Sequence, residues 1–349
     1  MKEVHDNIYC ITEKFKWPMF RPPANIYIIG GPKGIIFDSG YGTYADIRFF
    51  RKEYLKVLEN MKQKKRDFKP EYIIPSHSHG DHFSGLPGIR KFTKANVCLT
   101  PQMTEVLSSR SALINKHKIS NSPVRILWKE ERTKAAGRWD LIFPHLFGLK
   151  FINDPDIIIK EYEYISDGIK KWRVIPVKGH CDDHIALYNE SSGIMFCGDN
   201  ILNSVITWLG PPRSDLEQYC RTLGNIKSLK NLKTILPGHG SPVTEPVKRI
   251  KEILYHRRNR TKDVMEKIAS NKNKGIRFKD LRDQIYPPGT KFWVKSSGEG
   301  WILSTLEFLI KKRLINLKKE GSRTIIMPEK DIFSSSKKEK ILNTLYTPE

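Results

Sequence analysis

The chain has 349 residues, of which 39% are hydrophobic and 28% are charged, and its formal net charge is +23. This composition is typical of a folded globular protein and excludes a disordered or collagen-like chain. No stretch approaches the roughly 18 apolar residues of a membrane span, so we expect no membrane partner. The five cysteines are scattered without a CxxC pair, which predicts a reducing compartment and cytoplasmic localisation.

The first half of the chain predicts strands that alternate with helices. Two apolar runs, 26–29 and 34–37, are separated by Gly30, Gly31 and Pro32 and predict a hairpin. The elements expected next are a helix over 44–66, a buried strand over 72–74, and a loop over 80–92 that continues into a helix.

Residues 101–165 show no clean periodicity, and we expect an insertion of helices or loops there. Regular patterns resume afterwards, with expected strands over 172–177, 185–188, 194–197 and 234–236 and a helix over 218–229. Several strands interrupted by helices predict an α/β fold.

The composition changes near position 246. Helical patterns over 247–268, 278–286 and 301–317, and a hairpin over 321–327, predict a small helical, winged-helix-like domain over 246–330. We expect residues 331–349 to form a flexible tail.

Positive charge is concentrated in this last part of the chain. Residues 246–349 contain 25 Lys and Arg against 12 Asp and Glu, a balance of 25 − 12 = +13. Such a balance favours a nucleic-acid partner, although a lysine-rich solvated surface is an equally simple interpretation. Arg257, Arg258 and Arg260 share one predicted helix, where they could contact phosphate or pair with nearby acids.

The strongest chemical signal is a cluster of four potential metal ligands within six residues. His77, His79, Asp81 and His82 directly follow a predicted buried strand, where loops present functional groups. Imidazole nitrogens and carboxylate oxygens are standard zinc ligands. Because the whole chain has only ten histidines, three of them in six positions predict a metal site.

Further candidate ligands recur where later strands end. His180, Asp199 and His239 each follow an apolar run, and a glycine directly precedes each of them. A lone histidine after a strand is more often a surface or core residue. Together with the upstream cluster, however, the three positions predict that distant loops converge on one site.

These motifs, in this order, resemble those of the metallo-β-lactamase superfamily, whose members share an HxHxDH element followed by His, Asp and His motifs. The resemblance covers roughly residues 5–245 and implies a catalytic domain over 1–245. The implied fold is an αββα sandwich of two mixed sheets flanked by helices, with the metal ions at one edge.

The resemblance also implies a ligand set. The first metal would be held by His77, His79 and His180, and the second by Asp81, His82 and His239, with Asp199 bridging both. Asp38 matches the family's first motif and would orient the ligand loop, and we expect His184 to support the site without binding metal. The implied cofactors are two Zn²⁺ ions, with Mn²⁺ or Fe as alternatives.

Residues 179–188 and the C-terminal region resemble the mitochondrial β-lactamase-like endoribonuclease and its bacterial relatives. The implied function is a zinc-dependent hydrolase that uses a metal-bridging hydroxide on an ester, thioester or phosphodiester bond. Asp81 would be the catalytic residue that orients the hydroxide and relays its proton.

Two substrate classes remain open at this stage. A glyoxalase-II-like enzyme would take a small ester or thioester, whereas an endoribonuclease would cleave single-stranded RNA. A non-catalytic nucleic-acid-binding protein with a structural zinc is disfavoured, because structural zinc sites are closed by four ligands and seven candidates are present here.

Overall fold

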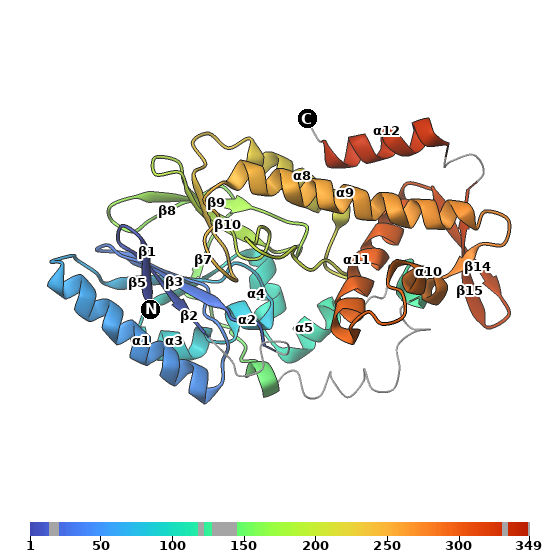
Figure 1. Cartoon of the computed structure of the whole chain (residues 1–349). Coiled ribbons are helices and arrows are strands. Elements are labelled where there is room, and N and C mark those ends of the chain that lie inside the picture. Colours follow the sequence, from blue (N-terminus) through green and yellow to red (C-terminus); the bar gives the residue numbers. More distant parts are fainter. Residues whose placement is uncertain (14–20, 118–121, 128–144, 330–333, 348–349) are drawn as a thin grey trace.

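The computed structural model describes residues 1–13, 21–117, 122–127, 145–329 and 334–347 (Figure 1). Two mixed β-sheets pack face to face and are flanked by helices, and a third, three-stranded sheet lies in the C-terminal region. The expected α/β sandwich of two mixed sheets with a C-terminal helical region is therefore confirmed.

The first sheet contains seven strands that lie in sequence order. Neighbours are antiparallel from β1 to β4 and parallel from β4 to β7. The expected hairpin is formed by β3 and β4. The strands are β1 (Lys2–His5), β2 (Ile8–Thr12), β3 (Asn25–Ile29), β4 (Gly34–Phe37), β5 (Pro70–Ile74), β6 (Asn96–Leu99) and β7 (Ile157–Ile158).

Helices α1 (Tyr44–Gln63) and α3 (Leu86–Thr93) cover the outer face of this sheet (Figure 1). Helix α1 begins where the Thr43 side chain accepts from the Asp46 backbone N–H and Asp46 bonds back to the Thr43 N–H, which forms a capping box. Its buried residues Phe50, Tyr54, Val57 and Met61 recur at helical spacing and pack into the core between helix and sheet.

The second sheet has the order β12-β11-β10-β9-β8, with β11 and β12 parallel and the other pairs antiparallel. Alternation along β10 serves two cores, because Leu187 faces the core shared with the first sheet whereas Ala186 and Tyr188 face the core beneath the helices. The strands are β8 (Tyr164–Ser166), β9 (Lys171–Pro176), β10 (Ile185–Asn189), β11 (Ile194–Phe196) and β12 (Thr234–Leu236).

Aromatic side chains hold the two sheets together. The ring of Phe196 lies 5.1 Å from Tyr27, 5.5 Å from Phe37 and 5.2 Å from Trp172, measured between ring centroids. All four side chains are buried. Because these strands end beside the candidate ligands, this packing fixes the edge of the sandwich at which the ligands lie.

The C-terminal region packs over the second sheet and helix α8 (Leu216–Lys227). Its long helix α9 (Pro246–Ser270) runs across the molecule (Figure 1). The elements that follow are β13 (Ile276–Arg277), α10 (Phe278–Ile285), α11 (Phe292–Lys311), β14 (Ile315–Glu320), β15 (Arg323–Pro328) and α12 (Ser335–Tyr346). The third sheet has the order β13-β15-β14.

Two expectations for this region were wrong. The helix expected over 301–317 begins earlier, at Phe292, and ends at Lys311, where β14 follows after a short turn. The expected flexible tail is instead a packed helix over most of its length, since Leu342, Leu345 and Tyr346 of α12 are buried against α9 and α8. Their helical spacing buries enough apolar surface to order the segment.

Only part of the expected 101–165 insertion can be compared, because 118–121 and 128–144 lie outside the described residues. Helices α4 (Pro101–Leu107) and α5 (Arg110–Lys116) open it. Its last part belongs to the sheets instead, because β7 pairs with β6 and β8 pairs with β9. Among the described residues, no helix has the length and apolar character needed to cross a membrane.

Candidate metal centre

The candidate ligands follow the carboxyl ends of strands that run in one direction. In the first sheet β4 and β5 are parallel, and in the second β9, β11 and β12 share a direction because β10 is antiparallel to both of its neighbours. The Ile185 N–H donates to the Ser76 carbonyl at 2.8 Å and joins the loops of the two sheets. All seven predicted ligands are thereby brought to one edge of the sandwich.

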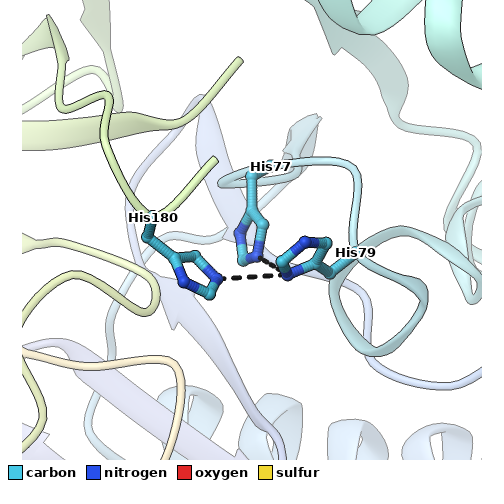
Figure 2. Close-up of side chains that lie close together, drawn as sticks. All are labelled: His77, His79 and His180. Carbon is cyan, nitrogen blue, oxygen red and sulfur yellow. Dashed lines mark hydrogen bonds between the residues drawn. The ribbon is translucent and has the colours of Figure 1, made fainter. Parts of the chain in front are cut away.

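Three imidazole rings form the first ligand group. Nδ1 of His79 lies 2.9 Å from Nε2 of His77 and 3.1 Å from Nε2 of His180 (Figure 2). Figure 2 shows these three nitrogens directed toward one another from two separate loops. One cation could therefore contact all three, since the ligand atoms lie within 4.8 Å of one another.

The second group contains Asp81, His82 and His239, whose ligand atoms also lie within 4.8 Å of one another. Nε2 of His239 is 3.4 Å from Asp81 Oδ2 and 3.3 Å from Asp199 Oδ2. Oδ1 of Asp199 lies 3.4 Å from His82 Nε2, and its Oδ2 lies 3.8 Å from His180 Nε2. The Asp199 carboxylate therefore touches members of both groups.

In three of the rings, the nitrogen that points away from the centre lies against an oxygen atom. Nδ1 of His82 lies 2.9 Å from Asp38 Oδ2, Nδ1 of His180 lies 2.8 Å from the Trp208 carbonyl, and Nδ1 of His239 lies 2.6 Å from the Pro23 carbonyl. A carbonyl oxygen only accepts, so Nδ1 of the last two rings carries the proton. Nε2 is consequently the ring nitrogen that faces the centre, and at His239 it must release its own proton before it can bind a metal.

Burial and neighbouring charges set the protonation states of these candidate ligands. Burial, with the neighbouring histidines, holds the pKa of His77 and His79 well below the usual value, so both rings are neutral. Burial alone would raise the pKa of Asp81, but His82 and His239 outweigh it and lower that pKa to about 2. Burial is likewise outweighed at His239, where Asp199 and Asp81 raise the pKa to about 10. The carboxylates thus favour positive charge here.

Two buried polar atoms of the site make no hydrogen bond to the described residues. Nε2 of His82 and Oδ1 of Asp199 are both buried and lie 3.4 Å apart, and neither makes a hydrogen bond to any of the described residues. Gly238 keeps the space beside them open, because a Cβ there would lie 2.5 Å from Asp199 Oδ1 and 2.7 Å from His82 Cε1. Buried polar atoms without partners are costly, and a divalent cation would satisfy both, so the donor set fits a metal.

Asp38 connects two parts of the ligand loop. Its Oδ1 accepts from the Ser76 N–H at 2.6 Å, and its Oδ2 faces His82 Nδ1. We predict that Asp38→Asn weakens metal binding about 10- to 100-fold, because the amide removes the charge behind His82. Asparagine tolerates the left-handed backbone at this position, φ +64°. Metal titration of the folded variant measures the effect, and wild-type affinity would contradict it.

His184 lies beside the ligands without joining either group. Its Nε2 accepts from the Asp199 N–H at 3.2 Å, and its Nδ1 lies 2.9 Å from the Asn200 side-chain amide. Both ring nitrogens are therefore engaged by the loop that carries Asp199. The ring contacts that loop and lies outside both ligand groups, and its supporting role stays a prediction.

Arg213 is a buried residue of the site that the sequence analysis missed. Its guanidinium contacts Asp182 at 2.5 Å, Asp183 at 2.9 Å and Ser78 Oγ at 2.5 Å. Ser78 lies between two candidate ligands and Asp182 follows a third, so Arg213 ties the two ligand loops together. No sequence signal marks it, because its partners lie at least 213 − 183 = 30 positions away.

Three of the four arginines of α9, the ones that the sequence analysis singles out, are engaged within the protein. Arg257 is buried and donates to the Thr207 carbonyl, and Arg258 pairs with Glu339. The guanidinium of Arg260 lies 4.3 Å from the ring centre of Trp301. These contacts favour internal pairing over phosphate contact for the arginines, so the basic charge available to a partner comes mainly from lysines.

Comparison with known proteins agrees with this geometry. Residues 20–239 match the sequence model of the metallo-beta-lactamase superfamily. The probable metallo-hydrolase YqjP of Bacillus subtilis is 35% identical over 257 residues, covering 68% of this chain and 74% of the relative. A beta-lactamase-like protein 2 homolog of Caenorhabditis elegans is 24% identical over 270 residues, covering 75% and 70%.

A crystal structure of a beta-lactamase domain protein from Burkholderia ambifaria shares the fold. It superposes with a TM-score of 0.71 at 15% identity and covers 94% of each chain. The family match spans well over half of the chain and contains all seven candidate ligands. This chain belongs to the metallo-beta-lactamase superfamily.

Proposed function

We propose that this protein is a metal-dependent hydrolase with a dinuclear centre. His77, His79 and His180 would hold one divalent cation, Asp81, His82 and His239 a second, and Asp199 would bridge them. One observation carries the proposal: seven donor side chains from four loops converge, with the Asp199 carboxylate against members of both groups. Nitrogen-rich ligands of this kind suit zinc, and Mn²⁺ or Fe would accept the same set.

A bound pair of such cations lowers the pKa of water and supplies hydroxide near neutral pH. The chain's own residues position the reaction. Asp81 is ionised, so its carboxylate can accept a hydrogen bond from the nucleophile, orient it and relay its proton onward. The side chains of His239, Asp81 and Asp199 are 13%, 12% and 11% exposed, so the centre is not completely buried.

Seven ligands around two positions favour catalysis over a structural role, because a structural zinc is closed by four protein ligands. The bond attacked would be an ester, thioester or phosphodiester.

Single-stranded RNA is the second candidate substrate, favoured by the +13 charge of residues 246–349. The element order α9-β13-α10-α11-β14-β15 supports a winged-helix-like domain over 246–330. The five cysteines are buried and form no disulfide, which supports a cytoplasmic location.

The test uses purified full-length protein reconstituted with zinc, manganese or iron. Metal analysis after dialysis should give two ions per chain. Hydrolysis is then measured with an aryl ester, a glutathione thioester, bis(p-nitrophenyl) phosphate and a single-stranded RNA oligonucleotide. Fewer than one ion under all loading conditions, or no metal-dependent turnover of any substrate, would overturn the proposal. Turnover confined to the esters would exclude the ribonuclease.

A further inference from the structure

The segment 207–215 lies directly against the candidate ligand His180. The Trp208 carbonyl accepts from His180 Nδ1 at 2.8 Å, and Ser214 Oγ donates to the His180 carbonyl at 2.7 Å. The Asp215 N–H donates to the Gly179 carbonyl at 2.9 Å. This segment therefore holds His180 at its ring and at its backbone, and the Trp208 carbonyl decides which ring nitrogen faces the centre.

The C-terminal region contacts the same segment through α9 and α11. Arg257 of α9 donates through Nη2 to the Thr207 carbonyl. At the other end, Lys311 of α11 pairs with Asp215 at 3.0 Å. Leu209 is buried in the same core cluster as the apolar residues of α9 and α11. Three consecutive residues, 207 to 209, thus connect the C-terminal region to a candidate metal ligand.

Helix α11 approaches this segment very closely. A Cβ on Gly300 would lie 2.6 Å from the Leu209 carbonyl oxygen and 2.8 Å from Nε1 of Trp208. Distances this short require glycine, because the nearest atom belongs to the backbone and cannot move aside cheaply. The backbone that orients His180 is therefore packed directly on α11.

Arg257 is unusual as a docking residue, because it is only 5% exposed. Among the described residues no carboxylate pairs with it, and its Nε makes no hydrogen bond. Burying a guanidinium without an acid is costly. An apolar side chain would pack the two surfaces together equally well. Two contacts distinguish arginine here: its donation to the Thr207 carbonyl, one residue from the carbonyl that holds His180, and the approach of its guanidinium to 5.8 Å from the ring centre of Tyr219.

We propose that the C-terminal region is a positioning device for the metal centre, in which Arg257 and Gly300 hold segment 207–215 so that the Trp208 carbonyl orients His180. This inference rests on the proposed function, because it takes His180 as a metal ligand. It assigns residues 246–346 a role at the hydrolytic site that is independent of any substrate they might bind.

The test compares adjacent arginines of α9 in the full-length protein. Arg257→Met removes the donor but keeps a long apolar side chain, whereas Arg258→Met removes a partly exposed pair with Glu339. Cobalt(II) is the probe, since its visible absorption reports the ligands around each ion. We expect Arg257→Met to bind one of two cobalt ions about 10-fold more weakly with an altered spectrum, and Arg258→Met to match the wild type.

Two further variants keep the outcome interpretable. Arg257→Lys retains a donor and should recover part of the cobalt affinity, which a merely structural loss would not explain. Gly300→Ala should weaken the same cobalt site from the α11 side, and it decides the question if Arg257→Met does not fold. Wild-type affinity and spectrum in folded Arg257→Met, or in Gly300→Ala, would overturn the inference. No cobalt binding by the wild type would instead overturn the proposed function.

Discussion

Asp199→Asn should leave the fold intact, remove at least one metal ion per chain and lower hydrolysis by more than 100-fold. The side chain is buried and lies within 3.8 Å of His82, His180 and His239. Asparagine keeps the shape but loses the charge that faces both ligand groups. Since every 1.4 kcal/mol is about tenfold in affinity, a 100-fold loss corresponds to about 3 kcal/mol.

The measurement is metal content after dialysis, followed by turnover with the best wild-type substrate. Asp263→Asn is the matched control, because Asp263 is an α9 surface residue that pairs only with Lys267 at 3.3 Å among the described residues. Its metal content and turnover should equal those of the wild type. Two tightly bound ions and normal turnover in Asp199→Asn would show that this carboxylate does not bridge a metal pair.

The candidate ligands could be predicted because they lie at the ends of strands. The first four are close in sequence, and each later one follows an apolar run that ends in glycine. Gly179 and Gly198 have φ values of +127° and +47°, which other residues rarely adopt, so the turn into each ligand has a sequence signature.

The groups that orient the ligands could not be predicted in the same way. The Trp208 and Pro23 carbonyls that face His180 and His239 belong to the backbone, so no residue type marks them. Arg213 reaches partners in two distant loops. Such contacts follow from how the loops pack, which a single sequence does not encode locally.

The sequence analysis also places the start of α11 too late in the chain, because it relies on local helix propensity. Ser296, Ser297, Gly298 and Gly300 are weak helix formers, so the sequence predicts a helix only from Trp301. In the structure the two glycines allow close packing, because a Cβ on Gly298 would lie 2.1 Å from the hydroxyl of Tyr286. Tertiary packing therefore outweighs propensity over this turn.

A chain that ends at residue 245 should fail to fold, although the family match itself ends at 239. One core cluster contains Ala186, Tyr188 and Met195 of the second sheet together with Ile250 and many other residues of the C-terminal region. Removing that region uncovers one face of the sheet. Full burial of one such side chain contributes about 1.5–3 kcal/mol, and losing several exceeds the roughly 5–15 kcal/mol that stabilises a domain.

Point substitutions test the same claim without truncation. Ile253 is fully buried in this shared core, whereas Tyr255 on the same helix is 68% exposed. Ile253→Asp should abolish the cooperative thermal transition, and Tyr255→Asp should leave the melting temperature unchanged. A soluble 1–245 fragment that melts cooperatively and retains wild-type metal content would contradict the prediction. If the fragment fails as expected, a truncated protein cannot distinguish an esterase from a ribonuclease, and the substrate has to be identified with the whole chain.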